Sequence, residues 1–353
     1  MGEHCLVHSI PPRFFLPSIN AVAAPGVTIA IVNCPPLLCI TGPTGSGKSE
    51  LALDLAAALG GEIVNCDSLQ VYRHFDIGSA KVPVAQRRGI PHHLLDVVDP
   101  NGLFTAGDYS RLGRETLASV SARGKLPIVV GGTGFYLRAL LDGLFPGPSR
   151  DEKLRARLTA REGRRPGSLH RILRRFDPPT AARIHPNDSN KILRALEVCL
   201  AGHLPMSDQF ALGRKPLTGF QTLKIGLDPP RDALRRRIGE RVVTMFESGL
   251  IEEVRRILAL GFAETSKPFE AIGYKEALEC FRGNISVSDA ITAAQIATRQ
   301  YAKRQMTWFR RDAATVWLAG FGAAPQVRGA ALEISEHTFK KQNNRSMFTK
   351  IIQ

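Results

Sequence analysis

The segment Gly42-Pro43-Thr44-Gly45-Ser46-Gly47-Lys48-Ser49 (GPTGSGKS) matches the phosphate-binding pattern GxxxxGK[ST] at every fixed position. The apolar run Leu37–Thr41 before it predicts a buried strand. Directly after it, Glu50–Leu59 combines helical apolar spacing with good helix formers and predicts a helix. A strand, a glycine-rich loop and a helix in this order are typical of a loop that binds a diphosphate or triphosphate.

The residue types of this loop have a direct chemical reason. Glycines let successive backbone N–H groups converge on a diphosphate, and the following helix N-terminus adds a partial positive charge. We expect Lys48 to reach the terminal phosphate and the Ser49 hydroxyl to hold Mg²⁺. Kinases, ATP-binding hydrolases and enzymes that hold a diphosphate leaving group share this loop, so it does not choose among them.

Further strands indicate the fold class. Glu62–Cys66 and Leu126–Val130 are short apolar runs, and Thr105–Arg123 between them has helical spacing. The alternation predicts an α/β fold, namely a P-loop NTPase-like parallel sheet with flanking helices. Kinases and hydrolases usually have an acid after the third strand, but here Gly131-Gly132-Thr133 follows. The acid at a strand end is instead Asp67, beside the expected phosphate site.

Composition divides the chain into successive parts. We predict a leader over residues 1–36, either disordered or the product of a mis-assigned start. Residues 37–148 form the first part of the core domain, and residues 149–222 an arginine-rich, α-helical insertion domain. Leu223–Leu227 predicts a returning strand that opens the second part of the core, residues 223–323. The weakly patterned residues 324–353 are expected to be a poorly ordered tail.

Charge separates the two halves of the chain. Residues 1–150 contain 12 Lys and Arg against 11 Asp and Glu, whereas residues 151–353 contain 35 against 21. A basic second half favours a polyanionic partner such as nucleic acid. The alternative is a solvated surface that happens to be rich in arginine.

The cysteines and the apolar N-terminal stretch bear on location. The six cysteines form no CxxC pair, which favours a reducing cytoplasm over a disulfide framework or a zinc site. Residues 14–47 contain no charge, so a signal peptide is the alternative to consider. Prolines at 17, 25, 35 and 36 interrupt this stretch, and we therefore expect no membrane-spanning helix.

Seven ordered blocks between residues 38 and 318 resemble the bacterial tRNA dimethylallyltransferases, which are isopentenyl-diphosphate:tRNA transferases. The blocks are GPTGSGKS at 42–49, DSLQVYRHFDIGSAK at 67–81, PHHLLDVVDP at 91–100, GGTGFYLRALLDG at 131–143, RIHPNDSNKILRALEV at 183–198, IGYKE at 272–276 and TRQYAKRQMTWFR at 298–310. Eukaryotic members carry a C-terminal zinc finger. Residues 319–353 contain no Cys and only His337, which favours the bacterial-type branch.

The resemblance implies a prenyl transfer. The loop would hold dimethylallyl diphosphate together with Mg²⁺, and the acceptor would be N6 of adenosine-37, next to the anticodon of a tRNA. Asp67 resembles the general base of the family, which removes an N6 proton. Thr133 resembles the threonine that contacts the reacting centre; the alternative is a helix N-cap before Gly134–Leu141. The enzyme is expected to be a monomer.

The resemblance also implies where an anticodon stem-loop binds. The matching residues are Asp67, Ser68, Leu69, Gln70, Thr133, Arg155, Asn190, Lys191, Ile192, Leu193, Arg194, Lys275, Lys303, Arg304 and Arg310. For Arg155 and Arg194 a solvated helix face is the alternative, and for Trp308 a core position is favoured over base stacking. Arg237 and Arg241 share a predicted helix face, with solvation as the default and diphosphate contact as the alternative. His92 and His93 are expected to pack or hydrogen-bond rather than to bind metal.

Three rival functions remain. A small-molecule kinase or NTPase would turn over ATP, and an adenylate isopentenyltransferase acting on free AMP would not need the arginine-rich insertion. A non-catalytic RNA-binding module would have no use for both the phosphate loop and Asp67.

Overall fold

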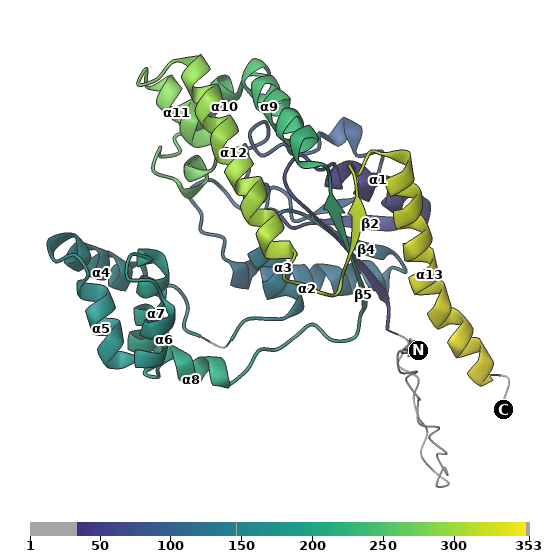
Figure 1. Cartoon of the computed structure of the whole chain (residues 1–353), viewed down its shortest axis with the longest axis horizontal. Helices are drawn as coiled ribbons and strands as arrows, with labels where there is room; N and C mark the ends of the chain where they lie inside the picture. Colours follow the sequence, from purple (N-terminus) through teal and green to yellow (C-terminus); the bar gives the residue numbers. More distant parts are fainter. Residues whose placement is uncertain (1–33, 146, 351–353) are drawn as a thin grey trace, which may run out of the picture. The chain divides into compact units, whose positions relative to one another are not determined.

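The computed structural model describes residues 34–145 and 147–350, with side chains described up to residue 340. The prediction of a disordered or mis-assigned leader falls mostly on residues 1–33, which lie outside the described residues. A six-stranded sheet with the spatial order β3-β2-β4-β1-β5-β6 forms the centre of the fold, and all its strand pairs are parallel (Figure 1). Its strands are β1 (Pro36–Thr41), β2 (Gly61–Asn65), β3 (His92–His93), β4 (Leu126–Val130), β5 (Gln221–Asp228) and β6 (Thr315–Ala319). The predicted α/β fold with a parallel sheet is confirmed.

Helices cover both faces of this sheet because alternate side chains of each strand point to opposite sides. On β1, Leu38 and Ile40 pack in a cluster with residues of α1 (Lys48–Leu59). Leu37 and Cys39 belong instead to a cluster with residues of α2 (Ala106–Ala122) and α3 (Gly134–Leu141). The central strand is therefore buried on both faces, which explains why its sequence is apolar throughout.

Five helices lie between α3 and β5. They are α4 (Glu152–Arg164), α5 (Ser168–Phe176), α6 (Pro178–Arg183), α7 (Ser189–Gly202) and α8 (Met206–Ala211). Aspartates cap three of them: Asp151, Asp177 and Asp188 accept backbone N–H groups at the starts of α4, α6 and α7. A separate apolar cluster that includes Leu158, Leu173 and Leu196 holds these helices together. We call residues 147–220 the helical lobe.

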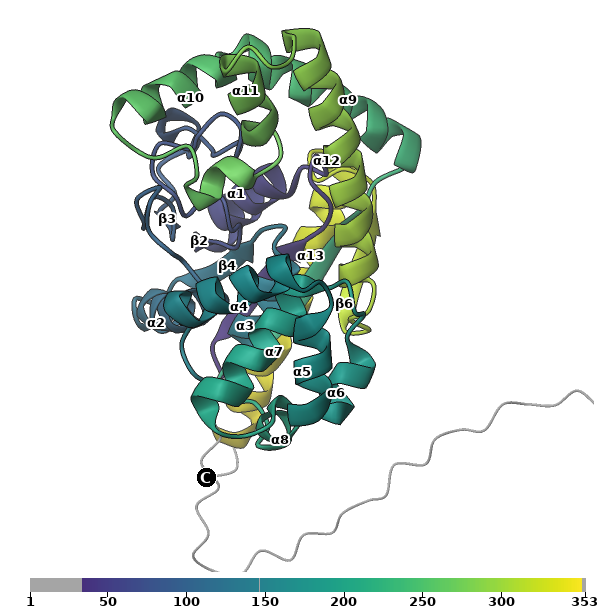
Figure 2. The same ribbon diagram turned by 90° about the vertical axis from the view of Figure 1, so that its left-hand side faces the viewer.

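A second helical group follows β5. It comprises α9 (Arg231–Glu247), α10 (Leu250–Ala259), α11 (Tyr274–Phe281) and α12 (Val287–Phe309), together with a short 3₁₀ turn at Lys267–Glu270. Another 3₁₀ turn, Val84–Gln86, lies between β2 and β3. Figure 2 shows α9 to α12 gathered near the segment that follows β2. Val71 and Phe75 of that segment pack in one cluster with Phe269 and Tyr274, so these helices hold the segment against the sheet domain.

The expectation of a poorly ordered tail over 324–353 is wrong for most of its length. Residues Pro325–Lys350 form α13, which packs beside α1 with Val327 and Ala331 buried (Figure 1). The buried stripe continues at Ser335, whose hydroxyl donates to the carbonyl of Ala331 at 2.7 Å. Small and polar residues on this stripe weaken the apolar pattern, so a packed helix is not apparent from the sequence.

Within the described residues no helix combines the length and apolar character needed to cross a membrane.

Candidate active site

The phosphate-binding loop turns between the end of β1 and the start of α1. Its backbone needs glycine at Gly45 and Gly47, where φ is 80° and 84°. A Cβ at Gly47 would also lie only 3.0 Å from the backbone nitrogen of Gly322. The turn closes with a hydrogen bond from Ser46 N–H to the carbonyl of Pro43 at 3.2 Å. The buried hydroxyl of Ser46 has no hydrogen-bond partner among the described residues.

Lys48 is folded back over this loop. Its Nζ donates to the carbonyl of Pro43 at 2.8 Å. The pKa of Lys48 is lowered to about 7, mainly by burial and also by repulsion from Arg241, and attraction by Asp67 opposes both effects. A cation that is costly to charge in the free protein gains most when an anion arrives beside it, which suits a diphosphate site. Ser49, next in the sequence, is exposed and lines a cavity that this loop borders.

A cavity of about 520 Å³ lies at the carboxyl ends of β1, β2 and β4. The phosphate-binding loop forms one wall, and residues 67–70 and 78–80 form another. Side chains of α9 and α12, including Arg237, Arg241 and Tyr301, complete it. The cavity places a diphosphate-type loop and an acid at a strand end in one space, as expected for a parallel sheet.

Asp67 lies two residues after the end of β2 and lines this cavity. Its Oδ1 accepts the backbone N–H of Leu69 at 2.9 Å and of Gln70 at 3.4 Å, forming a tight turn. The hydrogen bonds found for this carboxylate among the described residues all go to Oδ1, which leaves Oδ2 available to accept a proton from a bound molecule. Asp67 also interacts electrostatically with Lys48 and Arg241 across the cavity.

Thr133 sits at the N-cap position of α3, but its side chain does not cap that helix. Its hydroxyl oxygen accepts the backbone N–H of Ser68 at 3.0 Å and lies 3.3 Å from the Ser68 hydroxyl. The preceding Gly131 is required by close packing, because a Cβ there would lie 2.0 Å from the carbonyl oxygen of Cys66. Thr133 therefore joins the ends of β2 and β4 beside Asp67, and the alternative of a capping side chain is not what the structure shows.

Arg237, Arg241, Tyr301 and Gln305 line the cavity, although none of them was predicted as a site residue. Arg241 is only partly exposed and lines the cavity, so the expected solvated state is wrong for this residue. Burial lowers its pKa, and attraction by Asp67 partly offsets that effect. Arg237 bonds Glu50 of α1 at 3.3 Å and lies over the ring of Phe321. The shared helix face of the two arginines was visible in the sequence; their inward orientation depends on packing of α9.

Gln305 and Tyr301 of α12 are the other two. The buried Gln305 amide accepts the N–H of Thr44 at 2.8 Å and donates to the carbonyl of Gly132 at 2.8 Å, so it joins the phosphate-binding loop to the end of β4. Burial, followed by the Asp67 charge, raises the pKa of Tyr301 to about 12. Both residues lie within the TRQYAKRQMTWFR block, although nothing in its pattern indicated which of its side chains point inward.

The predicted RNA-binding residues of the helical lobe fall into two groups. Asn190 and Lys191 are exposed at the start of α7. Arg155 and Arg194 both bond the fully buried carboxylate of Glu197, at 3.2 and 2.7 Å, so the alternative of a solvated helix face is wrong for them. The prediction also needs correction for two further residues of α7, because the side chains of Ile192 and Leu193 are buried in the lobe's apolar cluster and cannot reach RNA.

The predicted RNA-binding residues of α11 and α12, and the one just after α12, are on the surface. Lys275 is exposed on α11, and Lys303, Arg304 and Arg310 are exposed on or just after α12. Lys303 and Arg304 line a shallow depression together with Trp308. Trp308 is half-buried, with the Arg138 guanidinium 5.4 Å from its ring centre, and so belongs partly to the core and partly to this surface.

The two histidines of β3 serve hydrogen bonds, as predicted. His93 Nε2 lies 2.7 Å from the Glu62 carboxylate, and His92 Nδ1 lies 2.8 Å from the carbonyl of Ile90.

Comparison with known proteins adds to this geometry. The family model described as "IPP transferase" matches residues 70–312. The tRNA dimethylallyltransferase of Solibacter usitatus is 63% identical over 298 residues, covering 84% of this chain and 97% of that protein. The corresponding protein of Koribacter versatilis is 53% identical over 301 residues, covering 85% and 98%.

Solved structures are similar as well. The full-length tRNA isopentenylpyrophosphate transferase of Bacillus halodurans superposes with a TM-score of 0.65 at 34% identity, covering 88% of this chain and 99% of that one. A eukaryotic dimethylallyltransferase, solved acting on tRNA, has a TM-score of 0.70 at 29% identity, covering 81% and 74%.

Proposed function

Because the chain belongs to the IPP transferase family, whose members include the tRNA dimethylallyltransferases, we propose that it transfers a dimethylallyl group from dimethylallyl diphosphate to N6 of adenosine-37 of tRNA. The supporting observation is the shared cavity, in which the phosphate-binding loop and Lys48 face Asp67. The loop and Lys48 can hold a diphosphate while Asp67 takes a proton.

The residues support a direct displacement. The exocyclic amine of adenine is a weak nucleophile because its lone pair is delocalised into the ring, so a base must assist it. As the N6–C1 bond forms, Asp67 accepts the N6 proton and the C1–O bond to diphosphate breaks. Lys48, Arg241 and the loop amides stabilise the negative charge that develops on the leaving diphosphate.

A magnesium ion fits this arrangement. Ser49 offers a hydroxyl oxygen on the cavity wall, which is a ligand type that Mg²⁺ accepts alongside substrate phosphate oxygens. Bound there, Mg²⁺ would supply further neutralisation of the diphosphate. We include Mg²⁺ in the proposed function on the chemistry of this donor and of the diphosphate.

Thr133 and the basic surfaces complete the proposal. The Thr133 hydroxyl lies next to Ser68 and Asp67, where it can contact the reacting base. We propose that an anticodon stem-loop binds across the exposed residues Asn190, Lys191, Lys275, Lys303, Arg304 and Arg310, with the adenine extruded into the cavity. Arg155 and Arg194 would act mainly by fixing the lobe that presents α7.

A single chain supplies each group invoked above, which supports a monomeric enzyme. A tRNA substrate supports a cytoplasmic location.

The test of the proposed function is mass spectrometry of tRNA digests after incubation with dimethylallyl diphosphate and Mg²⁺. A gain of one dimethylallyl group on adenosine is expected. Rapid ATP hydrolysis without RNA alkylation would favour the kinase or NTPase alternative, and modification of free AMP but not tRNA would favour the adenylate isopentenyltransferase.

A further inference from the structure

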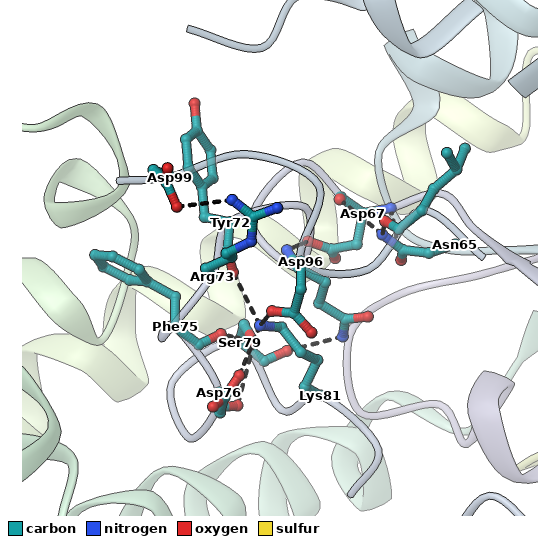
Figure 3. Close-up of polar contacts among 12 residues, drawn as sticks. Asn65, Asp67, Tyr72, Arg73, Phe75, Asp76, Ser79, Lys81, Asp96 and Asp99 are labelled. Atoms are coloured by element: carbon teal, nitrogen blue, oxygen red, sulfur yellow. Dashed lines mark hydrogen bonds and ion pairs between the residues drawn. The ribbon is translucent and has the colours of Figure 1, made fainter. Parts of the chain in front are cut away.

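The segment that carries Asp67 runs from residue 67 to Lys81. The Lys81 side chain folds back into this segment and is buried there. The Lys81 side chain is only 4% exposed. Its Nζ donates to the carbonyl of Tyr72 at 2.9 Å, to Asp76 Oδ1 at 2.6 Å and to Asp96 Oδ1 at 2.6 Å. Figure 3 shows the ammonium between the two carboxylates. All three N–H bonds of the group are therefore used to join three points of the chain.

These contacts lead back to the site. Asp96 N–H donates to the carbonyl of Gln70 at 3.2 Å, and the Gln70 amide donates to the carbonyl of Ser79 at 3.0 Å. Gln70 N–H in turn donates to Asp67 Oδ1. Gln70 and Ser79 line the cavity, whereas Lys81 is not among its lining residues. Lys81 thus fixes both parts of the cavity wall: residues 67–70 through Asp96, and residues 78–80 as their neighbour in the chain. It is not itself placed to touch a substrate.

A second anchor reaches the same segment from outside. The buried Glu253 of α10 accepts Ile77 N–H at 3.0 Å and the Tyr274 hydroxyl at 2.5 Å. Tyr274 in turn accepts the N–H of Gly78 at 3.1 Å. This anchor does not involve Lys81, so the segment keeps a hold on α10 and α11 when the lysine is replaced.

We propose that Lys81 is a positioning residue for the transfer reaction, because its ammonium fixes Gln70 and the 78–80 wall and through them sets the Asp67 carboxylate against the acceptor amine. The inference rests on the proposed function, in which Asp67 takes the N6 proton. Misplacement of a catalytic group by about 1 Å can lower a rate by about 100-fold. Because the phosphate-binding loop has its own hydrogen bonds, loss of Lys81 affects the chemical step more than diphosphate binding.

The test compares Lys81→Met with the wild type in single-turnover and steady-state alkylation of tRNA. We expect kcat per titrated active site to fall by about 10- to 100-fold, with the KM for dimethylallyl diphosphate and the Kd for tRNA within about twofold of wild type. Lys81→Arg, which keeps the charge, should recover part of the loss. A purely structural role would lower the melting temperature and the fraction of active protein while leaving kcat per active site unchanged.

Asp96→Asn provides a second variant that keeps the shape of the side chain. Asp99→Asn is its matched control, because Asp99 lies in the same segment but pairs with Arg73 at the surface, where both side chains are about half exposed. We expect several-fold loss of kcat for Asp96→Asn and none for Asp99→Asn. If Lys81→Met does not fold, this pair decides the question.

Wild-type kcat per active site in Lys81→Met, or equal kcat in Asp96→Asn and Asp99→Asn, would overturn the inference. A wild-type protein that never alkylates tRNA would overturn the proposed function instead, so the two failures are distinguishable.

Discussion

The phosphate-binding loop and the helical lobe are both rich in groups that suit anions, but they differ in how those groups are used. In the loop, the glycine-rich backbone and one lysine line the cavity, and the glycines that permit this turn are visible in the sequence. In the lobe, the predicted RNA-binding residues Arg155 and Arg194 instead form ion pairs with the buried Glu197. A binding motif built from backbone can be recognised by spacing alone, whereas a count of basic side chains cannot distinguish those that face a partner from those that stabilise the fold.

Replacing Asp67 tests the cavity half of this comparison and has the largest expected effect. Asp67→Asn keeps an oxygen for the turn at Leu69 and Gln70 but cannot accept the N6 proton. We expect kcat to fall by about 10²- to 10⁴-fold, measured by tRNA alkylation, while the Kd for tRNA changes little. Glu62→Gln, at the opposite end of β2, serves as the control. The Glu62 carboxylate pairs with His93 and Arg123 and does not line the cavity. An unchanged rate in Asp67→Asn would exclude Asp67 as the base.

Replacing Glu197 tests the lobe half. Glu197→Gln leaves Arg155 and Arg194 without their shared carboxylate, and both arginines are partly buried, with 14% and 35% of their side chains exposed. We expect the free energy of unfolding of the lobe to fall by about 1–3 kcal/mol, visible as faster hydrogen exchange in α4 and α7. The matched control is Glu152→Gln, whose partner Arg150 is exposed, with an expected loss under about 1 kcal/mol. Equal losses in the two variants would contradict a structural role for the Glu197 cluster.

The same distinction explains how much was predictable from sequence. The phosphate-binding loop, Asp67 and the parallel sheet follow from local patterns, since a strand and its next loop are determined by neighbouring residues. Arg241 and Gln305 enter the cavity from α9 and α12, far along the chain, and only packing decides which side of those helices faces inward. The burial of Ile192 and Leu193 likewise depends on helices that meet only in the fold.

The pH dependence of diphosphate binding isolates the contribution of Lys48. Since burial lowers its pKa to about 7, the ammonium is charged below that pH and becomes neutral above it in the free protein. A bound anion favours the charged form, so the Kd for inorganic diphosphate should rise above pH 7, by up to about tenfold per pH unit. Calorimetric titration between pH 6 and pH 9 measures this trend. Lys48→Arg is the control, because its guanidinium stays charged over the range, and equal slopes in both proteins would contradict the assignment.

The smallest expected effect belongs to single surface lysines, and it sharpens the contrast with Arg194. Lys303 is exposed beside Trp308, so Lys303→Gln should remove one phosphate contact without destabilising the fold. We expect the slope of log Kd against log salt concentration for tRNA to decrease by about one unit or less, with affinity weakened only a few-fold. Arg255→Gln on α10 is the control, since Arg255 is exposed but lies outside the proposed RNA surface. If instead Arg194→Gln changed the salt slope and left the stability of the lobe intact, the arginines of α7 would be direct phosphate contacts after all, and the division between binding and structural charges would have to be redrawn.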